Sequence, residues 1–414
     1  MMELFLDKLF LILAHTYLAK GKHQTVVVTG SVGKTSVTQA IATVLSEEYV
    51  VKATKQNYNT HRGVPLTVFD LTIPTLRIGW VSLIVRAATK AIFSRPKFSM
   101  LVLELGSDKP SDVAQFAFLK PDIAVVTATT PEHMEYFKTI DAVAEEELST
   151  SKFSREIIIN AELVPAKFIK KYSNDKSVIL YGNSTSNNVQ TDNNDVIISV
   201  EDSRISSSEY NLIGTAGLST LLASALVAKR LGMDSASINQ GLTNVRPVAG
   251  RMNKLAGIDG SVIIDDTYNS SPEAVRVALD YLYDQNVTKR IALLGMMNEM
   301  GDESEKFHRQ VGSWCDPGKL DLLVTLGKDA NNYLAEEAEK NGCTVVRTDS
   351  PYEAGNVIRT HLTKDTVVLA KGSQNGVYAE EAIKAWLLDP SDAQKLVRQH
   401  SYWPMKKAKQ FTPL

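Results

Sequence analysis

A glycine-rich turn between an apolar run and a helical stretch lies near the start of this 414-residue chain. The segment VVVTGSVGKTSV occupies residues 26–37. The β-branched residues 24–29 predict a buried strand, and residues 34–48 predict a helix. A strand, a glycine loop and a helix in this order hold phosphate groups with backbone N–H groups at the helix N-terminus. This unit predicts an α/β fold with its site at the carboxyl ends of parallel strands.

The loop departs from the commonest phosphate loop, G-x-x-x-x-G-K-[ST], because Val28 replaces its first glycine. The other residue types still suit a nucleotide phosphate. Gly30 and Gly33 permit a tight turn, Lys34 can reach the β- and γ-phosphates, and Thr35 can place its hydroxyl on Mg²⁺. A glycine turn without a ligand is the alternative, which the flanking strand and helix disfavour.

Apolar runs continue on both sides of a polar segment. Four of them predict further buried parallel strands: residues 99–106, 122–130, 156–160 and 177–183. The polar segment, residues 183–211, predicts small antiparallel strands. Later runs alternate with helices and predict a smaller Rossmann-like unit. We therefore expect three parts: an apolar N-terminal helix (1–24), a central phosphate-loop domain (25–248) and a C-terminal Rossmann-like domain (249–414).

The composition excludes several classes of function. Hydrophobic residues make up 44% and charged residues 22%, and the net charge is −2, which gives no basis for nucleic-acid binding. The two cysteines, Cys315 and Cys343, cannot build a cysteine-based zinc site or a disulfide framework. This pattern fits a protein of a reducing cytoplasm.

Two apolar segments are candidates for peripheral membrane contact. Residues 1–20 predict a helix whose charge-free run is too short to span a bilayer. Residues 76–97 combine helical apolar spacing and Trp80 with basic side chains, and no acidic residue lies between Asp70 and Glu104. Each segment is either an interfacial membrane helix or a helix packed on the first domain, and both interpretations stay open.

Polar residues follow two of the predicted strands. Glu104 ends the run LVLELG, where a carboxylate can complete a Mg²⁺ shell beside the phosphate loop. His133 follows the strand at 122–130 and is surrounded by acidic residues. A strand-end glutamate, a lone histidine and an acidic helix face also occur in purely structural settings, so these residues alone do not define a site.

Residues 25–385 resemble the Mur ligase family, most closely its MurF type, whose members add D-alanyl-D-alanine to a UDP-N-acetylmuramoyl-tripeptide. The resemblance rests on eight segments in the family's order: TGSVGKTS, NYNTHRGVPLTVF, LVLELGSDKPSD, VVTATTPEHMEYF, GRM, IIDDTYNSSPEAV, LLGMMNEMGDESEKFH and VLAKGS. The phosphate loop of this family is similar to G-[ST]-x-G-K-[ST]-[ST], without the earlier glycine. The resemblance implies that the phosphate held is that of ATP.

The resemblance also implies roles for individual residues. Those implied to hold ATP are Gly30, Ser31, Val32, Gly33, Lys34, Thr35, Ser36, Arg251, Asp265, Asp266, Tyr268 and Asn269. Those implied to bind two Mg²⁺ ions are Thr35 or Ser36 with Glu104 at the first site, and His133 at the second. Those implied to face the substrates are Asn57, Asn59, Thr60, His308, Lys371, Gly372 and Ser373. The catalytic residues implied are Lys34, Glu104, His133, Arg251 and Lys371.

The implied reaction is ATP-dependent amide-bond formation in peptidoglycan precursor synthesis, in the cytoplasm or at the inner face of its membrane. A substrate carboxylate attacks the γ-phosphate to give an acyl phosphate, which an amine then attacks. Gathering these anions requires concentrated positive charge, and a C-terminal domain that closes would exclude water. The partners implied are small molecules, a muropeptide and a dipeptide.

Three departures from the family pattern matter. The family's carbamylated lysine, which helps to hold the second Mg²⁺, falls on Glu147. Either this carboxylate replaces the carbamate, or it faces solvent and the second site is weak. The family's G-x-H-x-x-x-N element reads Gly214, Ala216 and Thr220, without either polar side chain. The phosphate loop begins already at Gly30, which leaves no room for an N-terminal domain that grips the uridine nucleotide.

Other functions stay open for these reasons. The chain could be a ligase for another acceptor, as in folylpolyglutamate synthases and cyanophycin-type ligases, or for a lipid-linked muropeptide. A non-catalytic ATP-binding scaffold is a further alternative. The retained residues Lys34, Glu104, His133, Arg251 and Lys371 argue against the scaffold.

Overall fold

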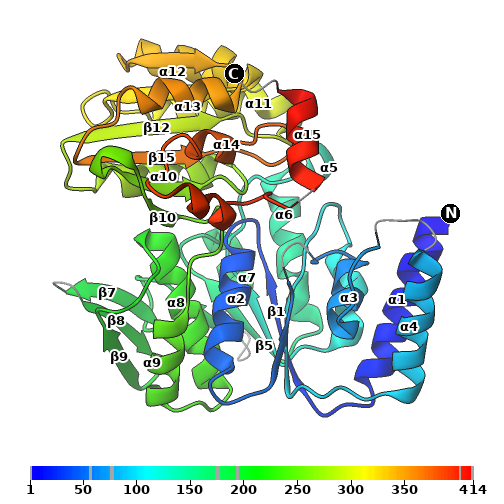
Figure 1. The fold of residues 1–414 in the computed structure, drawn as a ribbon. Coiled ribbons are helices and arrows are strands. Elements are labelled where there is room, and N and C mark those ends of the chain that lie inside the picture. Colours follow the sequence, from blue (N-terminus) through cyan, green and yellow to red (C-terminus); the bar gives the residue numbers. More distant parts are fainter. Residues whose placement is uncertain are drawn as a thin grey trace. The chain divides into compact units, whose positions relative to one another are not determined.

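The computed structural model describes residues 2–55, 58–74, 79–172, 178–192, 195–400 and 402–411. The chain divides into two compact units: unit 1 comprises residues 1–130, 136–212 and 216–246, and unit 2 comprises residues 131–135, 213–215 and 247–414. Each unit has a central sheet covered by helices (Figure 1). The α/β class expected from the sequence is confirmed.

Unit 1 is built on a six-stranded sheet in the order β2-β3-β1-β4-β5-β6, and every neighbouring pair is parallel. Its strands are β1 (Gln24–Thr29), β2 (Val51–Ala53), β3 (Met100–Glu104), β4 (Ile123–Val126), β5 (Glu156–Asn160) and β6 (Val178–Tyr181). Because β1 lies between β3 and β4, the loop after β1 opens at the carboxyl edge of the sheet beside the ends of both neighbours.

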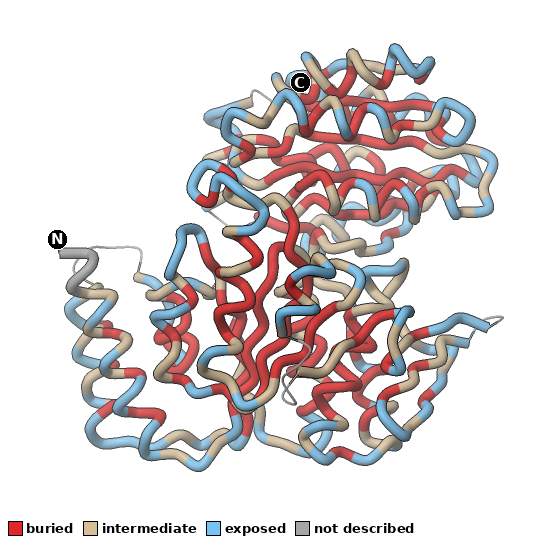
Figure 2. The backbone as a smooth tube through the Cα atoms, turned by 180° about the vertical axis from the view of Figure 1, so that it is seen from behind, coloured by how far each residue is buried: buried red, intermediate tan, exposed pale blue. Residues whose placement is uncertain are grey.

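Alternate residues of β1 enter two separate hydrophobic cores, as the two-residue repeat of a strand requires. Val26 and Val28 pack with α2, α8 and α9, whereas Val27 packs with α1, α3 and α4. Helices therefore cover both faces of the sheet, and its central strands β3 and β4 are buried throughout (Figure 2). The helices of unit 1 are α1 (Met2–Leu18), α2 (Lys34–Leu45), α3 (Gly63–Phe69), α4 (Gly79–Phe93), α6 (Ile140–Glu147), α7 (Ala166–Tyr172), α8 (Gly214–Arg230) and α9 (Ser235–Asn244).

Shorter elements complete unit 1. The polar segment after β6 forms the expected antiparallel strands β7 (Asn188–Asp192), β8 (Asp195–Val200) and β9 (Ser203–Ser207). Short helical turns lie at η1 (Val113–Leu119), η2 (Leu148–Lys152) and α5 (Met134–Phe137), and α5 continues from the segment 131–135 that belongs to unit 2.

Unit 2 has its own six-stranded sheet, in the order β10-β11-β15-β12-β13-β14. Its strands are β10 (Asn253–Ala256), β11 (Val262–Asp266), β12 (Lys289–Gly295), β13 (Leu322–Leu326), β14 (Val345–Thr348) and β15 (Thr366–Lys371). The helices are α10 (Pro272–Tyr283), α11 (Ser304–Ser313), α12 (Ala335–Lys340), α13 (Pro351–Arg359), α14 (Glu380–Ile383) and α15 (Tyr402–Gln410), with shorter turns η3 (Ile258–Gly260), η4 (Gly301–Glu303), η5 (Ala330–Leu334) and η6 (Pro390–Lys395). The strand β10 pairs antiparallel with β11 and was not expected from the sequence.

The N-terminal helix α1 is part of unit 1. Phe10, Ala14, Tyr17 and Leu18 are buried in the core that α1 shares with α3 and α4. This core shows that α1 packs on the domain along one face. No helix in the described part of the chain is long and apolar enough to cross a membrane.

Candidate active site

The phosphate loop follows β1 and is positioned by hydrogen bonds with the residues that follow β4. Gly30 has a φ of +123° and Gly33 a φ of +87°, and a Cβ atom added at Gly30 would lie 2.3 Å from Oγ1 of Thr127. Only glycine therefore fits at position 30. Oγ1 of Thr127 donates to the carbonyl of Val32 at 2.6 Å, and the backbone N–H of Ser31 donates to the carbonyl of residue 128 at 2.9 Å. These contacts fix the loop independently of a ligand.

Helix α2 begins at Lys34, directly after the loop, so its free N–H groups point towards the loop. Gly33 is its N-cap in a left-handed conformation, and no side chain caps this end. The Lys34 ammonium contacts the carbonyl of Gly30, within the loop itself. The Thr35 side chain is buried beside it. An uncapped helix N-terminus beside a lysine ammonium is an arrangement that can hold an anion.

Glu104 ends β3 in register with Val28 of β1, so its side chain lies one strand away from the loop. It is almost fully buried, and its backbone N–H donates to Oγ1 of Thr54 at 3.0 Å. Oε1 accepts from the Asn59 amide at 2.8 Å, whereas the buried Oε2 has no hydrogen-bond partner among the described residues. A buried carboxylate oxygen without a partner is costly, and a cation would compensate it.

The segment expected to face the acceptor substrate holds Glu104 and starts α3 instead. Asn59 donates to Glu104, and its own carbonyl accepts from the N–H of Gly106 at 2.8 Å. Oγ1 of Thr60 accepts from the N–H of Gly63, the first residue of α3, at 3.2 Å. In this structure Asn59 therefore positions Glu104, and Thr60 positions the first residue of α3. Asn57, the third residue expected here, lies outside the described residues.

Glu147 lies at the phosphate loop. It is the last residue of α6, is 2% exposed, and its Oε2 accepts from the backbone N–H of Gly30 at 2.7 Å. Its backbone carbonyl accepts from Oγ1 of Thr29 at 3.1 Å, which ties the end of α6 to the end of β1. The alternative that Glu147 faces solvent is therefore wrong. Its neighbour Glu146 instead stabilises the turn 111–113, because both of its carboxylate oxygens accept from backbone N–H groups of that turn.

His133 pairs with a carboxylate that the sequence did not point to. Its Nδ1 lies 3.0 Å from Oε2 of Glu299, and Nε2 lies 3.7 Å from Oε1 of Glu132. The pKa of Glu299 is lowered, chiefly by its hydrogen bond with His133. A carboxylate at Nδ1 is the usual partner that orients the ring of a metal-binding histidine. His133 also has a φ of +50°, which few non-glycine residues adopt.

In unit 2, the two aspartates at the end of β11 have different surroundings. Asp265 is fully buried and accepts from the N–H of Gly250 at 3.0 Å and from Oγ1 of Thr267 at 2.6 Å. Burial raises the pKa of Asp265 to about 6. Asp266 forms an ion pair with Lys371 at 2.6 Å. Asp265 therefore holds the loops together, and Asp266 is the better candidate for contact with a nucleotide.

Lys371 and Arg251 are placed differently from each other. Lys371 is buried at the end of β15, and besides Asp266 it donates to the carbonyl of Asn269 at 2.9 Å. Arg251 lies over the ring of Tyr268 at 4.1 Å, and its buried Nε has no hydrogen-bond partner in the described part of the chain. An arginine stacked on an aromatic ring with donor groups to spare can bind an anion. Lys371 instead orders Asp266 and the 269 loop.

His308, which the sequence led us to expect at the substrate, forms its hydrogen bonds within unit 2 in this structure. His308 is fully buried, its Nε2 accepts from the N–H of Met297 at 2.9 Å, and its Nδ1 contacts the carbonyl of Ser304 at 2.7 Å. Ser373 is buried too, and its hydroxyl accepts from the N–H of Asn298 at 3.0 Å. A Cβ atom at Gly372 would lie 2.9 Å from the Val377 side chain, so its role in this structure is close packing. These residues shape the 297–298 segment.

The burial of His308 predicts a dependence of stability on pH. Desolvation lowers its pKa, so the folded protein keeps this histidine neutral. Below about pH 6.5 the unfolded chain binds a proton at this histidine that the folded chain does not bind. The free energy of unfolding therefore decreases as the pH is lowered. When the pH is lowered from neutral to acidic, we expect the thermal unfolding temperature of H308Q to decrease less than that of the wild type. Equal pH profiles would show that another group titrates.

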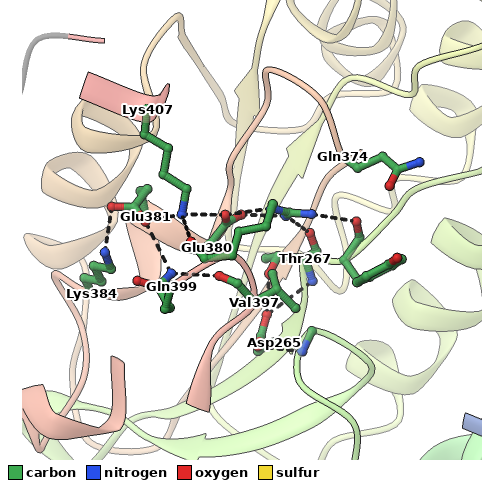
Figure 3. Close-up of polar contacts among 12 residues, drawn as sticks. Asp265, Thr267, Gln374, Glu380, Glu381, Lys384, Val397, Gln399 and Lys407 are labelled. Carbon is green, nitrogen blue, oxygen red and sulfur yellow. Dashed lines mark hydrogen bonds and ion pairs between the residues drawn. The ribbon is translucent and has the colours of Figure 1, made fainter. Parts of the chain in front are cut away.

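A buried charge network joins the last helix to the loop after β11 (Figure 3). Arg398 donates to both oxygens of Glu380, at 2.8 and 2.7 Å, and to the carbonyls of Thr267 and Tyr268 at 2.6 and 3.0 Å. Lys407 of α15 lies 2.6 Å from Glu381 and 2.9 Å from Glu380. Asp265 and Thr267 lie at the other end of this network in the same view. No sequence motif pointed to Arg398 or Lys407, which lie in a polar C-terminal segment.

The structure thus separates the expected residues into two groups. In unit 1 it brings together the loop residues 30–36, Glu104 and Glu147; in unit 2 it brings together Asp266, Tyr268, Asn269 and Lys371. In the family's G-x-H-x-x-x-N element, Thr220 donates to the carbonyl of Ala216 at 2.8 Å and does not replace the missing asparagine. Among the described residues, no three histidine, cysteine or acidic side chains cluster as a ready-made metal site.

Comparison with protein families gives two matches along the chain. The model of the Mur ligase middle domain matches residues 28–78 and 83–228, and that of the Mur ligase, glutamate ligase domain matches residues 250–374.

Comparison with curated proteins points the same way. The UDP-N-acetylmuramoyl-tripeptide–D-alanyl-D-alanine ligase of Bacillus subtilis is 25% identical over 389 residues, which cover 91% of this chain and 79% of that protein. The Synechocystis ligase of the same name is 28% identical over 379 residues, which cover 88% of this chain and 76% of that protein.

Solved structures share the fold. The MurF ligase from Thermotoga maritima, in complex with ADP, superposes with a TM-score of 0.74 at 23% identity and covers 92% of this chain and 83% of its own. FolC of E. coli in complex with ADP gives a TM-score of 0.62 at 14% identity, over 89% of this chain and 90% of its own.

Proposed function

Because this chain belongs to the Mur ligase family, we propose that it is an ATP-dependent ligase that adds D-alanyl-D-alanine to a UDP-N-acetylmuramoyl-tripeptide during peptidoglycan precursor synthesis. The relatives that carry this name align over most of the chain. The observation that supports the proposal is the glycine loop at Gly30–Thr35, which lies one strand from a Glu104 carboxylate oxygen that has no partner among the described residues.

The proposed reaction has two steps. An oxygen of the tripeptide carboxylate attacks the γ-phosphorus of ATP, and ADP leaves. The amine of the dipeptide then attacks the acyl carbon, phosphate leaves, and the nitrogen loses a proton to form the amide. No side-chain nucleophile is needed. The protein contributes by binding ATP at the loop, by stabilising developing negative charge with Lys34, and by excluding water.

The residues at the loop fit Mg²⁺ on one observation, the buried Oε2 of Glu104, which has no hydrogen-bond partner in the described part of the chain. Mg²⁺ prefers oxygen ligands, and Thr35 supplies a hydroxyl beside the same loop. We assign Thr35 and Glu104 to a first ion. Glu147 of unit 1 is assigned to a second ion. In unit 2, the imidazole of His133 is oriented by Glu299 and is a further candidate metal ligand. When bound, the ions neutralise charge on the phosphates.

We propose that Glu147 supplies, without CO₂, the carboxylate that the family obtains from a carbamylated lysine. A buried carboxylate against the N–H of Gly30 would repel ATP phosphates unless a cation lay between them. Removing dissolved CO₂ and bicarbonate should leave wild-type turnover unchanged. The variant E147K should become bicarbonate-dependent, and E147Q should bind fewer Mn²⁺ ions per ADP, as measured by electron paramagnetic resonance. A wild-type enzyme that needs bicarbonate would contradict the proposal.

In unit 2 we assign Asp266, Tyr268 and Asn269 to the nucleoside of ATP, and Arg251 to its terminal phosphate. Arg251 has a donor to spare, and Asp266 is fixed by its ion pair with Lys371. Asp265 and His308 form their hydrogen bonds with other residues of the protein, so we assign no ligand to them.

The test of the function measures phosphate release from ATP with Mg²⁺, with UDP-N-acetylmuramoyl-tripeptide and D-alanyl-D-alanine added separately and together. We expect release that requires both substrates, and a pentapeptide product in the mass spectrum. ADP binding without release in the presence of both would rule out this substrate pair. Because the chain shares its fold with FolC, a folate with glutamate is the second pair to assay. We further propose a cytoplasmic location, where ATP and nucleotide-linked precursors are available.

A further inference from the structure

Helix α4 carries two apolar faces, of which the core uses one. Leu83, Ala87 and Ala91 are buried in the core shared with α1 and α3. Val81, Val85 and Ile92 lie on the other side, because positions i, i+4 and i+11 fall within about 40° of one another around an α-helix. They are 64%, 58% and 60% exposed, and Phe93 beside them is 81% exposed. We call Val81, Val85, Ile92 and Phe93 the α4 face.

The α4 face is presented by a firmly held helix. The Lys20 ammonium donates to the carbonyl of Ile92 at 2.6 Å and also contacts the preceding carbonyl, so it caps the end of α4. At the other end, Trp80 packs edge-on against Phe10 of α1, and the Arg62 guanidinium lies 5.1 Å from its ring. Figures 1 and 2 show α1 and α4 side by side at one margin of unit 1. The exposed side chains therefore stand on a rigid support.

Positive charge borders the α4 face. Arg86, Arg95 and Lys97 are exposed around it, and Lys8 within α1 and Lys22 four residues after α1 are also exposed. No acidic residue occurs between Asp70 and Glu104 in the sequence. An apolar stripe bordered by arginine and lysine matches the chemistry of an anionic bilayer, in which acyl chains lie beneath negative headgroups.

We propose that α1 and α4 dock unit 1 on an anionic phospholipid bilayer, with the α4 face inserted among the headgroups. A second copy of the chain is the less suitable occupant. In a two-fold interface the same patch meets itself, so the basic border would face an identical basic border. Docking of this kind holds the protein on the membrane surface and requires no spanning helix.

The experiment is co-sedimentation of the full chain with vesicles of phosphatidylcholine alone or of phosphatidylcholine mixed with phosphatidylglycerol. We expect binding only to the mixed vesicles, and weaker binding at high salt. The double variant V85D/F93D should reduce binding by more than about tenfold. The double variant R86A/K97A should reduce it by about fivefold per residue, the factor for one basic side chain at such a surface. L388D, which places one aspartate at a residue that is 63% exposed in unit 2, is the control for added negative charge and should bind as the wild type does.

Three outcomes would overturn the proposal. The first is absence of binding to the mixed vesicles, and the second is equal binding by wild type and V85D/F93D. The third is a lipid-free wild type that is dimeric by light scattering while V85D/F93D is monomeric, since the α4 face would then bind a second copy. Phosphate release with soluble substrates should be the same in V85D/F93D and wild type. This second measurement separates failure of docking from failure of the proposed ligase activity.

Discussion

K34A should lower ATP-dependent product formation by roughly 10²-fold or more, the scale on which one preorganised electrostatic contact acts. Lys34 is the cation of the phosphate loop, and its ammonium already lies against the carbonyl of Gly30 before any phosphate is bound. Its loss removes positive charge at the point where negative charge develops on the transferred phosphoryl group. The measurement is phosphate release and product mass at saturating substrates.

The control for K34A is K55A, which removes an equally charged side chain that is 75% exposed and pairs with Asp70 at the surface. K55A should retain wild-type turnover. Thermal unfolding of K34A should show an intact fold, so that a loss of activity reports on chemistry. A K34A enzyme that turns over within a few-fold of wild type would exclude the loop from catalysis. In a scaffold without turnover, K34A would change partner binding alone.

R398A should destabilise unit 2 by about 3–5 kcal/mol, the cost of breaking a buried ion pair from one side. Arg398 satisfies both oxygens of the fully buried Glu380 and two backbone carbonyls of the loop after β11. Alanine would leave Oε2 of Glu380 and the two carbonyls without this donor, whereas Oε1 of Glu380 would keep its contact with Lys407. Urea unfolding followed by tryptophan fluorescence measures the change, because the buried Trp386 lies in unit 2.

The matched control for R398A is R276A, which breaks an exposed pair with Glu273 on α10. Exposed pairs of this kind contribute less than about 1 kcal/mol. R398K keeps the charge but not the planar fork, so its stability should lie between those of wild type and R398A. A loss in R398A no larger than in R276A would mean that water replaces the guanidinium.

The parts of the fold that the sequence predicted depend on local patterns. The β-branched run before Gly30, the loop and the helix from Lys34 form a contiguous unit, so their geometry follows from neighbouring residues. The later apolar runs gave the parallel strands for the same reason. The strand β10 was missed because its sequence, NKLA, is short and only half apolar, and its antiparallel pairing with β11 sets its conformation.

The candidate site was predictable as residue types and only partly as contacts. Position along the chain pointed to Glu147 but not to its bond with Gly30, which links residues 117 positions apart. Glu299 was missed because its partner His133 lies far away in sequence. Asn59 and His308 were assigned to substrate by resemblance, yet their polar atoms bond to Glu104 and Met297. Residue type does not reveal whether a polar group is already satisfied within the protein.

The buried charge network has a consequence for how unit 2 is made. Arg398 and Lys407 are translated after everything they contact, including Thr267 and the two glutamates at the start of α14. While the ribosome still covers them, Glu380 lacks both of its cations and Glu381 has Lys384 alone, so the Glu380 carboxylate must stay in water. The C-terminal half of the chain therefore completes its core only after Lys407 has left the ribosome, and nascent chains stalled before Arg398 should be cleaved readily by quality-control proteases.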